Sequence, residues 1–426
     1  MNKNWQDFSS ILQKLQFEDS PAGGSLVIFK DGQMVVNESV GKARLDGTDE
    51  DNGDWHDKRL SVNFSIGKGV LATLIAVLVS HGLLDYDKPV AYYWQEFGCA
   101  GKEHITLRHI LTHTARLFDV SSLTHDLEDL TNWQMMLDKV AQMSPTTPKN
   151  QEQHHYASAY SALVSGWILG GLVERVTKLS LQNALDEYLA QPLGVAGEMF
   201  WGVPSDRLHQ VAKPLRYFNE EENIKRKPTL KPESLHVLEV LGSFEIAKLW
   251  RDKLAESPLN TANINKLYFD ATKMNLANYK NALMPNGKDG LAYHANAVLQ
   301  AMIPAANGVS TANALATMYA MHANGGVWQG QRLITPSVLS DMRLVRIDGF
   351  DAVMPANMRW RSGFHRLFSL QHTPSAYGHM GYNGSVAFCD PDRRLAMAFI
   401  HNFDTTMMND VRQFVLSETA INLVKF

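Results

Sequence analysis

The sequence predicts an α/β (α+β) fold, in which an antiparallel sheet is flanked by helices and joined to a second, mainly helical lobe. Residues 21–44 and 384–403 each contain two β-rich runs separated by a short turn, so both ends of the chain supply a hairpin. Residues 86–290 are instead rich in helix formers and poor in β-branched alternation. One sheet built from the two chain ends, with helices from the middle, satisfies both observations.

The order of these segments predicts two domains. Asp31-Gly32 marks the turn of the first hairpin, and the second turns at residues 390–394 before an amphipathic pattern over about residues 409–424. We expect an α/β sheet domain from residues 1–85 plus 291–426, and a helical domain from residues 86–290. Residues 206–290 are charged and irregular, with a helical stretch near residues 237–255, and are expected to form a solvated surface insertion or a mobile cap.

The composition excludes several classes of partner. Hydrophobic residues make up 45% of the 426 residues and charged residues 20%, as in ordinary globular proteins. The net charge of −4 provides no attraction for nucleic acid or anionic membranes. The longest apolar run, residues 69–80, is shorter than the roughly 20 residues of a membrane span, and residues 1–17 lack a signal-peptide core. We expect a soluble, cytoplasmic protein, with homo-oligomerisation left open.

A serine and a lysine stand at the start of the apolar stretch FSIGKGVLATLIAVLVSHGLL, residues 64–84. Their spacing of three places Ser65 and Lys68 on one face of a helix, within reach of each other. Burial would lower the pKa of Lys68 toward neutrality, so that it could take the proton of Ser65. The Ser65 N–H, free at a helix start, could stabilise an oxyanion. The alternative is a serine that only caps the helix.

The same letters, S-x-x-K, also occur at Ser39 and Lys42. That copy lies in a predicted strand, where residues three apart point to opposite faces. The predicted secondary structure therefore leaves only the pair at Ser65 and Lys68 with a geometry in which the two side chains can cooperate.

A serine hydrolase needs further groups that two other segments could supply. A tyrosine can pass protons between lysine, serine and leaving group when a cation lowers its pKa, and Tyr156 and Tyr160 are candidates, although aromatic residues four apart usually pack in a core. Residues 377–388, YGHMGYNGSVAF, could provide a second oxyanion donor because their glycines permit close approach to a strand. We expect His379 to face the cleft, with a structural role as the alternative.

Taken together, these motifs resemble the serine β-lactamase and penicillin-binding-protein superfamily, most closely the class C-like branch that contains family VIII carboxylesterases. There an S-x-x-K motif, a tyrosine motif and a K/H-T-G or W-G-G strand motif follow in this order. The resemblance spans most of the chain and implies a β-lactamase/transpeptidase-like fold. Four further segments that resemble the family are HGLLDYDKPVAYYWQEF at 81–97, ITLRHILTHTARL at 105–117, YLAQPLGV at 188–195, and PAANGVSTANALATMYAMHANGG at 304–326.

The resemblance implies roles for individual residues. Ser65 corresponds to the nucleophile, Lys68 to its general base, and His379-Met380-Gly381 to the K-T-G motif. The backbone N–H groups of Ser65 and Tyr382 would form the oxyanion hole.

The resemblance also separates the two tyrosines. Tyr160 is preferred as the proton relay because residues 160–170 match the esterase pattern Y-H-A-x-T-x-G-W-L-x-G, whereas Tyr156 resembles Y-S-N with serine for asparagine and stays an alternative. Asn307, in the segment that resembles the later active-site wall, is expected to contact substrate together with Tyr156. The literal Y-x-N at Tyr279 lies in the irregular insertion and is treated as chance.

Departures from the family pattern favour an ester over a lactam. His379 replaces the lysine of β-lactamases, and the preferred alignment lacks the asparagine that contacts a lactam amide. Arg116 stands where the family has a glycine that permits a tight turn. The G-H-T-G-x-G-G strand becomes GHMGYNG at 378–384, so a bulkier cleft wall is expected.

These observations predict a serine hydrolase that cleaves small carboxylic esters through an acyl-enzyme, without a cofactor. A small-molecule ester or amide is the expected substrate. A weak β-lactamase or a D-amino-acid peptidase is the alternative enzyme, and a non-catalytic relative that binds a ligand in the same cleft is the alternative of another class. A metal site at His109 and His113, four residues apart, is explained better by the resemblance of residues 105–117 to the family's helix.

Overall fold

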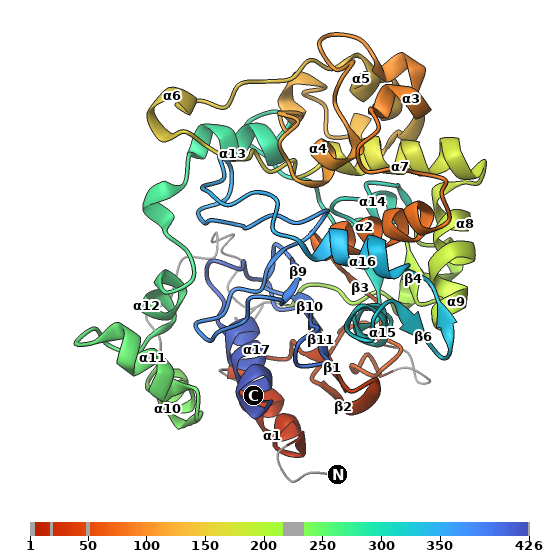
Figure 1. Ribbon diagram of the computed structural model, residues 1–426. Helices are drawn as coiled ribbons and strands as arrows, with labels where there is room; N and C mark the ends of the chain where they lie inside the picture. The colour runs from red at the N-terminus through yellow and green to blue at the C-terminus, as the bar shows by residue number, and fades with distance from the viewer. Residues whose placement is uncertain (1–4, 18–19, 48–51, 216–233, 425–426) are drawn as a thin grey trace.

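A six-stranded antiparallel sheet forms the centre of the computed structural model, which describes residues 5–17, 20–47, 52–215 and 234–424 (Figure 1). The strand order is β2-β1-β11-β10-β9-β8. The strands are β1 Gly24–Lys30, β2 Gln33–Val40, β8 His365–Arg366, β9 Tyr377–Met380, β10 Val386–Asp390 and β11 Leu395–His401. Pairing of β1 with β11 joins the two ends of the chain, which confirms the predicted sheet.

Both predicted hairpins form. At the β1–β2 turn Asp31 and Gly32 have φ of 53° and 75°, the left-handed conformation at both central positions that a tight hairpin turn requires. The β10–β11 hairpin closes with Asp390 opposite Leu395. The predicted C-terminal helix is α17, Arg412–Leu423.

The sheet separates two helical layers. Along β11, Leu395, Met397 and Phe399 pack with α17 and α1 (Asp7–Lys14), whereas the alternate Ala396, Ala398 and Ile400 pack with α15 (Ala312–Ala323). This alternation follows from the two-residue period of a strand. The small side chains on the second face allow the alanine-rich α15 to lie close to the sheet.

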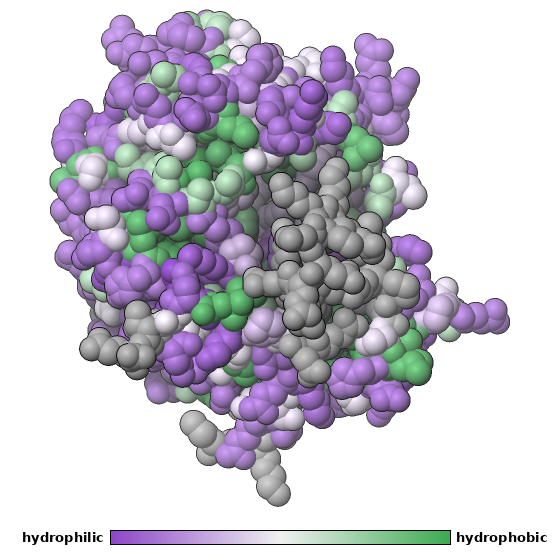
Figure 2. All heavy atoms as spheres, turned by 180° about the vertical axis from the view of Figure 1, so that it is seen from behind, coloured by the Kyte–Doolittle hydropathy of each residue, from purple (hydrophilic) through white to green (hydrophobic). Residues whose placement is uncertain are grey.

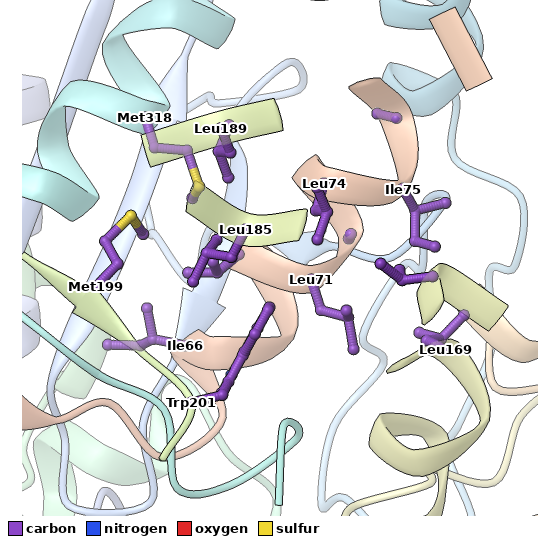
Figure 3. Close-up of a cluster of buried hydrophobic side chains, with 14 of the residues drawn as sticks. Ile66, Leu71, Leu74, Ile75, Leu169, Leu185, Leu189, Met199, Trp201 and Met318 are labelled. Atoms are coloured by element: carbon purple, nitrogen blue, oxygen red, sulfur yellow. The ribbon is translucent and has the colours of Figure 1, made fainter. Parts of the chain in front are cut away.

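Helix α2, Ile66–Ser80, lies between the α15 face of the sheet and the helical lobe, and all but its last two residues are buried. Its side chains Ile66, Leu71 and Leu74 meet Leu185, Met318 and their neighbours in one cluster (Figure 3). A helix that is buried on nearly every side carries no polar stripe, and α2 is apolar apart from Lys68, Thr73 and its last residue, Ser80. The same buried cluster extends through both predicted parts of the chain, and the division into two domains stays a prediction.

The helical lobe lies above the sheet in Figure 1. Its α-helices are α3 Val90–Tyr93, α4 Leu107–Leu111, α5 Trp133–Gln142, α6 Gln151–His154, α7 Val164–Thr177, α8 Leu181–Leu185 and α9 Gln191–Leu193. Smaller elements connect it to the sheet: β3 Ser61–Val62, β4 Met199–Phe200, β5 Val309–Ser310, α14 Asn296–Gln300, β6 Val327–Trp328, β7 Gln331–Arg332 and α16 Pro336–Arg343. Seen from behind, the surface is largely hydrophilic, with smaller apolar areas (Figure 2).

No helix in the described parts of the chain has both the length and the apolar character that crossing a membrane requires. The cytoplasmic location stays a prediction.

The described part of the predicted insertion is a folded layer and not simply a solvated excursion. Residues 216–233 lie outside the described residues, and the rest forms α10 Leu235–Ser243, α11 Ala247–Leu254, α12 Thr261–Lys266 and α13 Leu276–Leu283. Trp250 of α11 is fully buried and donates a hydrogen bond of 3.0 Å to the Tyr268 hydroxyl. Tyr268 stacks on Phe414 of α17 and donates to the buried Glu418. Trp250 and Tyr268 are enough to fix the layer against α17, although the surrounding sequence is polar. For this reason the overall composition of the segment did not predict a packed layer.

If the insertion is part of the core, Trp250→Ala should lower the free energy of unfolding by about 3–5 kcal/mol, the usual cost of removing a buried tryptophan. Lys248→Ala, at an exposed position on the same helix, should change it by less than about 0.5 kcal/mol. Urea unfolding followed by tryptophan fluorescence and circular dichroism measures both. Equal stability of the two variants would show that α11 is not anchored.

Candidate active site

Ser65 lies at a sharp turn between a strand and a helix. Strand β3 pairs with β5, and the Asn63 N–H donates to the Gly308 carbonyl at 2.7 Å. The next residue, Phe64, has φ of 49°, a left-handed conformation that costs a bulky residue on the order of 1–3 kcal/mol. This turn leaves Ser65 half-buried at the start of α2, as the sequence predicted.

Lys68 is buried one turn further along α2. Its Nζ lies 2.7 Å from the carbonyl oxygens of both Ala162 and Ala305, and 3.3 Å from Ser65 Oγ. Burial lowers the pKa of Lys68 well below its ordinary value. A neutral amine has two N–H groups, which the two carbonyls accept, and its lone pair is then left to face Ser65 Oγ. The geometry therefore suits removal of the serine proton.

Tyr160 completes a group of three. Its hydroxyl donates a hydrogen bond of 2.7 Å to Ser65 Oγ, and Lys68 Nζ lies 4.8 Å from the centre of its ring. Burial raises the pKa of Tyr160, so the hydroxyl keeps its proton. The expectation that a cation lowers this pKa is wrong for the resting site, because Lys68 itself is driven toward its neutral form by burial. Tyr160 is placed to give a proton before it takes one.

A buried carboxylate holds the Tyr160 segment in place. Asp351 Oδ1 accepts the Tyr160 N–H at 3.2 Å, and its Oδ2 accepts from the Ser158 hydroxyl at 2.6 Å and from Trp360 Nε1 at 3.3 Å. The Trp360 ring stacks on Tyr160 at 5.6 Å, and the His113 ring meets Tyr160 edge-on at 5.0 Å. Asp351 and Trp360 escaped the sequence analysis, since each lies about 190 residues or more from Tyr160 and belongs to no motif recognised there.

Ser65 opens into a cavity of about 520 Å³. Its wall contains aromatic side chains, among them Phe64, Tyr279, Tyr293, Tyr382 and Phe403, and aliphatic ones that include Leu163, Leu283, Met284 and Leu291. The Phe64 ring meets those of Tyr293 at 5.2 Å and Tyr382 at 6.0 Å. The motif at Tyr279 was treated as chance, yet its tyrosine lies in this wall. The arrangement suits a substrate with an apolar part.

A family model described as Beta-lactamase matches residues 8–418. The chain belongs to the β-lactamase family. It is 29% identical over 398 residues to "Esterase/beta-lactamase LipL" of Mycobacterium tuberculosis, a match that covers 92% of this chain and 80% of LipL. Two solved structures are similar over 98% of this chain and 97% of their own: a penicillin-binding protein homolog from Caulobacter crescentus, with TM-score 0.71 and 26% identity, and a family VIII carboxylesterase, with TM-score 0.72 and 25% identity.

Membership in the β-lactamase family confirms the predicted superfamily and fold and makes the chain a member of a serine hydrolase family. The structure also separates the predicted residues into those that meet Ser65 and those that do not. Lys68 and Tyr160 meet it. Tyr156 lies half-buried with its ring 5.4 Å from that of His154, and no hydrogen bond joins it to Ser65 within the described chain.

The side chains of the second S-x-x-K copy, Ser39 and Lys42, bond to other residues and not to each other. The Ser39 hydroxyl pairs with that of Ser25 on β1, and Lys42 forms an ion pair with Asp54.

The prediction that His379 faces the cleft is wrong for this β-lactamase-family chain. Its side chain is only 1% exposed and is absent from the cavity wall, and its Nε2 lies 2.8 Å from the Gly363 carbonyl, to which it donates. Burial lowers the pKa of His379 well below its ordinary value, so the ring is neutral and supplies no positive charge to a substrate. Aromatic neighbours, among them Trp360 and Phe364, enclose it.

Gly381 and Tyr382 lie where the strand motif of the family predicts. A Cβ on Gly381 would lie 3.2 Å from the Asn63 carbonyl, so glycine permits the close approach of this strand end to the Ser65 segment. Within the described residues, no acceptor pairs with the backbone N–H of Ser65 or of Tyr382. Both groups are therefore free to bind an oxyanion.

Asn307 is not a substrate contact. It is fully buried, and its amide donates to the carbonyls of Val298 and Ala301 and accepts from the Ile303 N–H. Its side chain fixes the loop that carries Ala305, the carbonyl partner of Lys68. Asn307 thus acts on the site through the position of Lys68.

His109 and His113 do not act as a metal-binding pair. His109 Nδ1 accepts the Thr106 N–H in a capping box at the start of α4, and His113 Nδ1 accepts the Ser161 N–H. The two imidazoles therefore serve separate parts of the backbone. Arg116, at the family's glycine position, adopts a left-handed φ of 57°, the conformation for which glycine is better suited.

The two tyrosines can be distinguished by covalent labelling of Ser65. Tyr160→Phe should slow reaction with an aryl phosphonate at least about a hundredfold, because the group that protonates the leaving aryloxide is lost. Tyr156→Phe should leave the rate within about twofold, since this ring does not meet Ser65. Intact mass against time gives the rates, and peptide mapping gives the labelled residue. Equal slowing by both variants would contradict the assignment.

The pH dependence of the same labelling tests Lys68. A general base acts when deprotonated, so the rate should fall as pH drops through the lowered pKa of Lys68 and level off above it, well before the ordinary lysine value. Lys68→Met should slow labelling by about 10²–10⁴-fold and remove this dependence. Circular dichroism checks that the variant is folded. A wild-type rate that still rises up to pH 10.5, the ordinary value, would contradict a base with a lowered pKa.

Proposed function

We propose that this β-lactamase-family protein is a carboxylesterase that cleaves small carboxylic esters through an acyl-enzyme on Ser65. The observation that carries the proposal is the three-residue hydrogen-bonded group in which Ser65 Oγ lies 3.3 Å from Lys68 Nζ and 2.7 Å from the Tyr160 hydroxyl. The similarity to a protein named "Esterase/beta-lactamase" and to a family VIII carboxylesterase supports the choice of an ester.

Acylation follows from these positions. Ser65 Oγ attacks the ester carbonyl carbon while its proton passes to the neutral amine of Lys68. The negative charge that forms on the carbonyl oxygen is stabilised by the N–H groups of Ser65 and Tyr382. When the bond to the alcohol breaks, Tyr160 protonates the leaving alkoxide and is reprotonated from Lys68. The alcohol therefore leaves with the proton of Tyr160, and the proton that Lys68 took from Ser65 restores the Tyr160 hydroxyl.

Deacylation reverses the proton flow. A water molecule attacks the acyl carbonyl and gives its proton to the Lys68–Tyr160 pair, the oxyanion again binds the same two N–H groups, and Ser65 Oγ leaves with a proton. The products are a carboxylic acid and the free serine. No step requires a metal or a cofactor.

The side chains near Ser65 favour an ester substrate over a lactam, because few of them could bind the amide of a lactam. The third residue of the preferred tyrosine motif is Ala162, which offers a carbonyl to Lys68 and no side-chain amide to a substrate. Asn63 Oδ1 accepts from the Ser310 hydroxyl, and Asn383 bonds to the His401 carbonyl and the Ser385 N–H. The side-chain oxygen of Asn63 and both the oxygen and the nitrogen of the Asn383 amide are thus engaged with the protein. A neutral His379 likewise lacks the charge that attracts the carboxylate of a β-lactam or peptide.

The proposal predicts esterase activity that depends on Ser65. Wild-type protein should hydrolyse p-nitrophenyl butyrate with a kcat/KM at least about a hundredfold above that for a chromogenic cephalosporin. Ser65→Ala should reduce ester hydrolysis by about 10³-fold or more, because the nucleophile is removed. Absorbance assays with matched protein concentrations measure both.

The other outcomes identify the alternatives. Faster turnover of the cephalosporin or of a D-amino-acid amide would favour the lactamase or peptidase. Binding of these compounds without turnover, at any acyl length, would favour a non-catalytic relative.

A further inference from the structure

Helix α13 and the chain that follows it form one wall of the Ser65 cavity. Of the residues that line the cavity, Tyr279, Leu283, Met284, Leu291 and Tyr293 come from this one segment, residues 279–295. Residues 279–290 were expected to belong to a solvated insertion or a mobile cap and residues 291–295 to the sheet domain, so their shared place in the wall of the Ser65 cavity is a property that the motifs do not show.

The wall is held firmly against the helical lobe. The buried Asn278 accepts the Lys149 N–H at 2.8 Å and donates to the Lys149 carbonyl at 3.2 Å, so one side chain pairs both backbone groups of that residue. Asn281 donates to Asp119, and the ring of His125 meets the Pro285 carbonyl at 3.0 Å. Side chains fixed in this way can select a ligand by shape, because the wall does not need to be ordered on binding.

The chemistry of the wall is apolar near Ser65. Phe64 is the residue before Ser65, and its ring meets the Tyr293 ring edge-on. The aliphatic side chains of Leu283 and Met284 line the cavity next to these rings. Burial raises the pKa values of Tyr279 and Tyr293, so both phenols are uncharged. A volume of about 520 Å³ lies in the range of cavities that enclose a drug-sized ligand and far exceeds the need of an acetyl group.

From this geometry we infer that the α13 wall selects esters in which one side, acyl or alcohol, is a bulky apolar group that fills the cavity between Leu283, Met284 and the aromatic rings beside Ser65. The inference rests on the proposed esterase function and names its substrate class. Each methylene that enters the cavity should raise kcat/KM about fourfold, until the cavity is full.

Two ester series test the inference: p-nitrophenyl esters with acyl chains of increasing length, and acetate esters of alcohols of increasing size. One series should show rising kcat/KM over several carbons. Leu283→Trp, which fills part of the cavity, should lower kcat/KM for the preferred long esters at least about tenfold more than it lowers kcat/KM for the smallest acetate ester.

Leu276→Trp is the matched control, since it makes the same change on the same helix at a side chain that is 64% exposed and outside the cavity wall. It should leave both series unchanged, and circular dichroism confirms that both variants fold. Flat profiles in both series, or equal effects of the two substitutions, overturn the inference while the esterase proposal stands. If no ester is hydrolysed by the wild-type protein, the esterase proposal itself fails.

Discussion

The burial of Lys68 is the constraint on which the site depends. Its amine is held by the carbonyls of Ala162, which follows the helical-lobe tyrosine, and Ala305, which precedes the strand β5. An uncompensated ammonium in such a place is costly, so burial favours the neutral amine, and that form is the one that can take a proton from Ser65. The neutral amine that can act as a base therefore depends on the packing of the helical lobe and the sheet region around α2.

Other residues of the site hold Ser65 and Tyr160 close to the Lys68 amine. The strained turn at Phe64 presents Ser65, and a backbone in this conformation persists only where its surroundings fix it. Here the pairing of β3 with β5 and the core around α2 supply that fixation. Asp351 and Trp360 fix Tyr160 from a loop distant in sequence. Stability and catalysis thus share the same packed residues.

Local sequence signals predicted the parts of the molecule that are decided locally. The turn at Asp31-Gly32, the second hairpin at residues 384–403 and the three-residue spacing of Ser65 and Lys68 each follow from backbone geometry over a few residues. The superfamily resemblance added Tyr160 to these. Packing decided the rest. The rings of Trp360 and Phe364 and the Gly363 carbonyl, 15 to 19 positions away, contact His379, and the Asn307 amide bonds to backbone groups four to nine residues before it. The role of α13 depends on contacts with Lys149 and Asp119, which no periodicity indicates.

The most direct test of this account is the charge of Lys68 in the resting protein. An NMR titration of protein labelled with ¹⁵N-lysine, assigned by comparison with Lys68→Met, measures the pKa of this one amine. We predict a pKa well below the ordinary 10.5, because burial disfavours the ammonium, so that the amine loses its charge at a lower pH than an exposed lysine does. A Lys68 that stays charged up to pH 10.5 would contradict this account, because an ammonium has no lone pair with which to take the proton of Ser65.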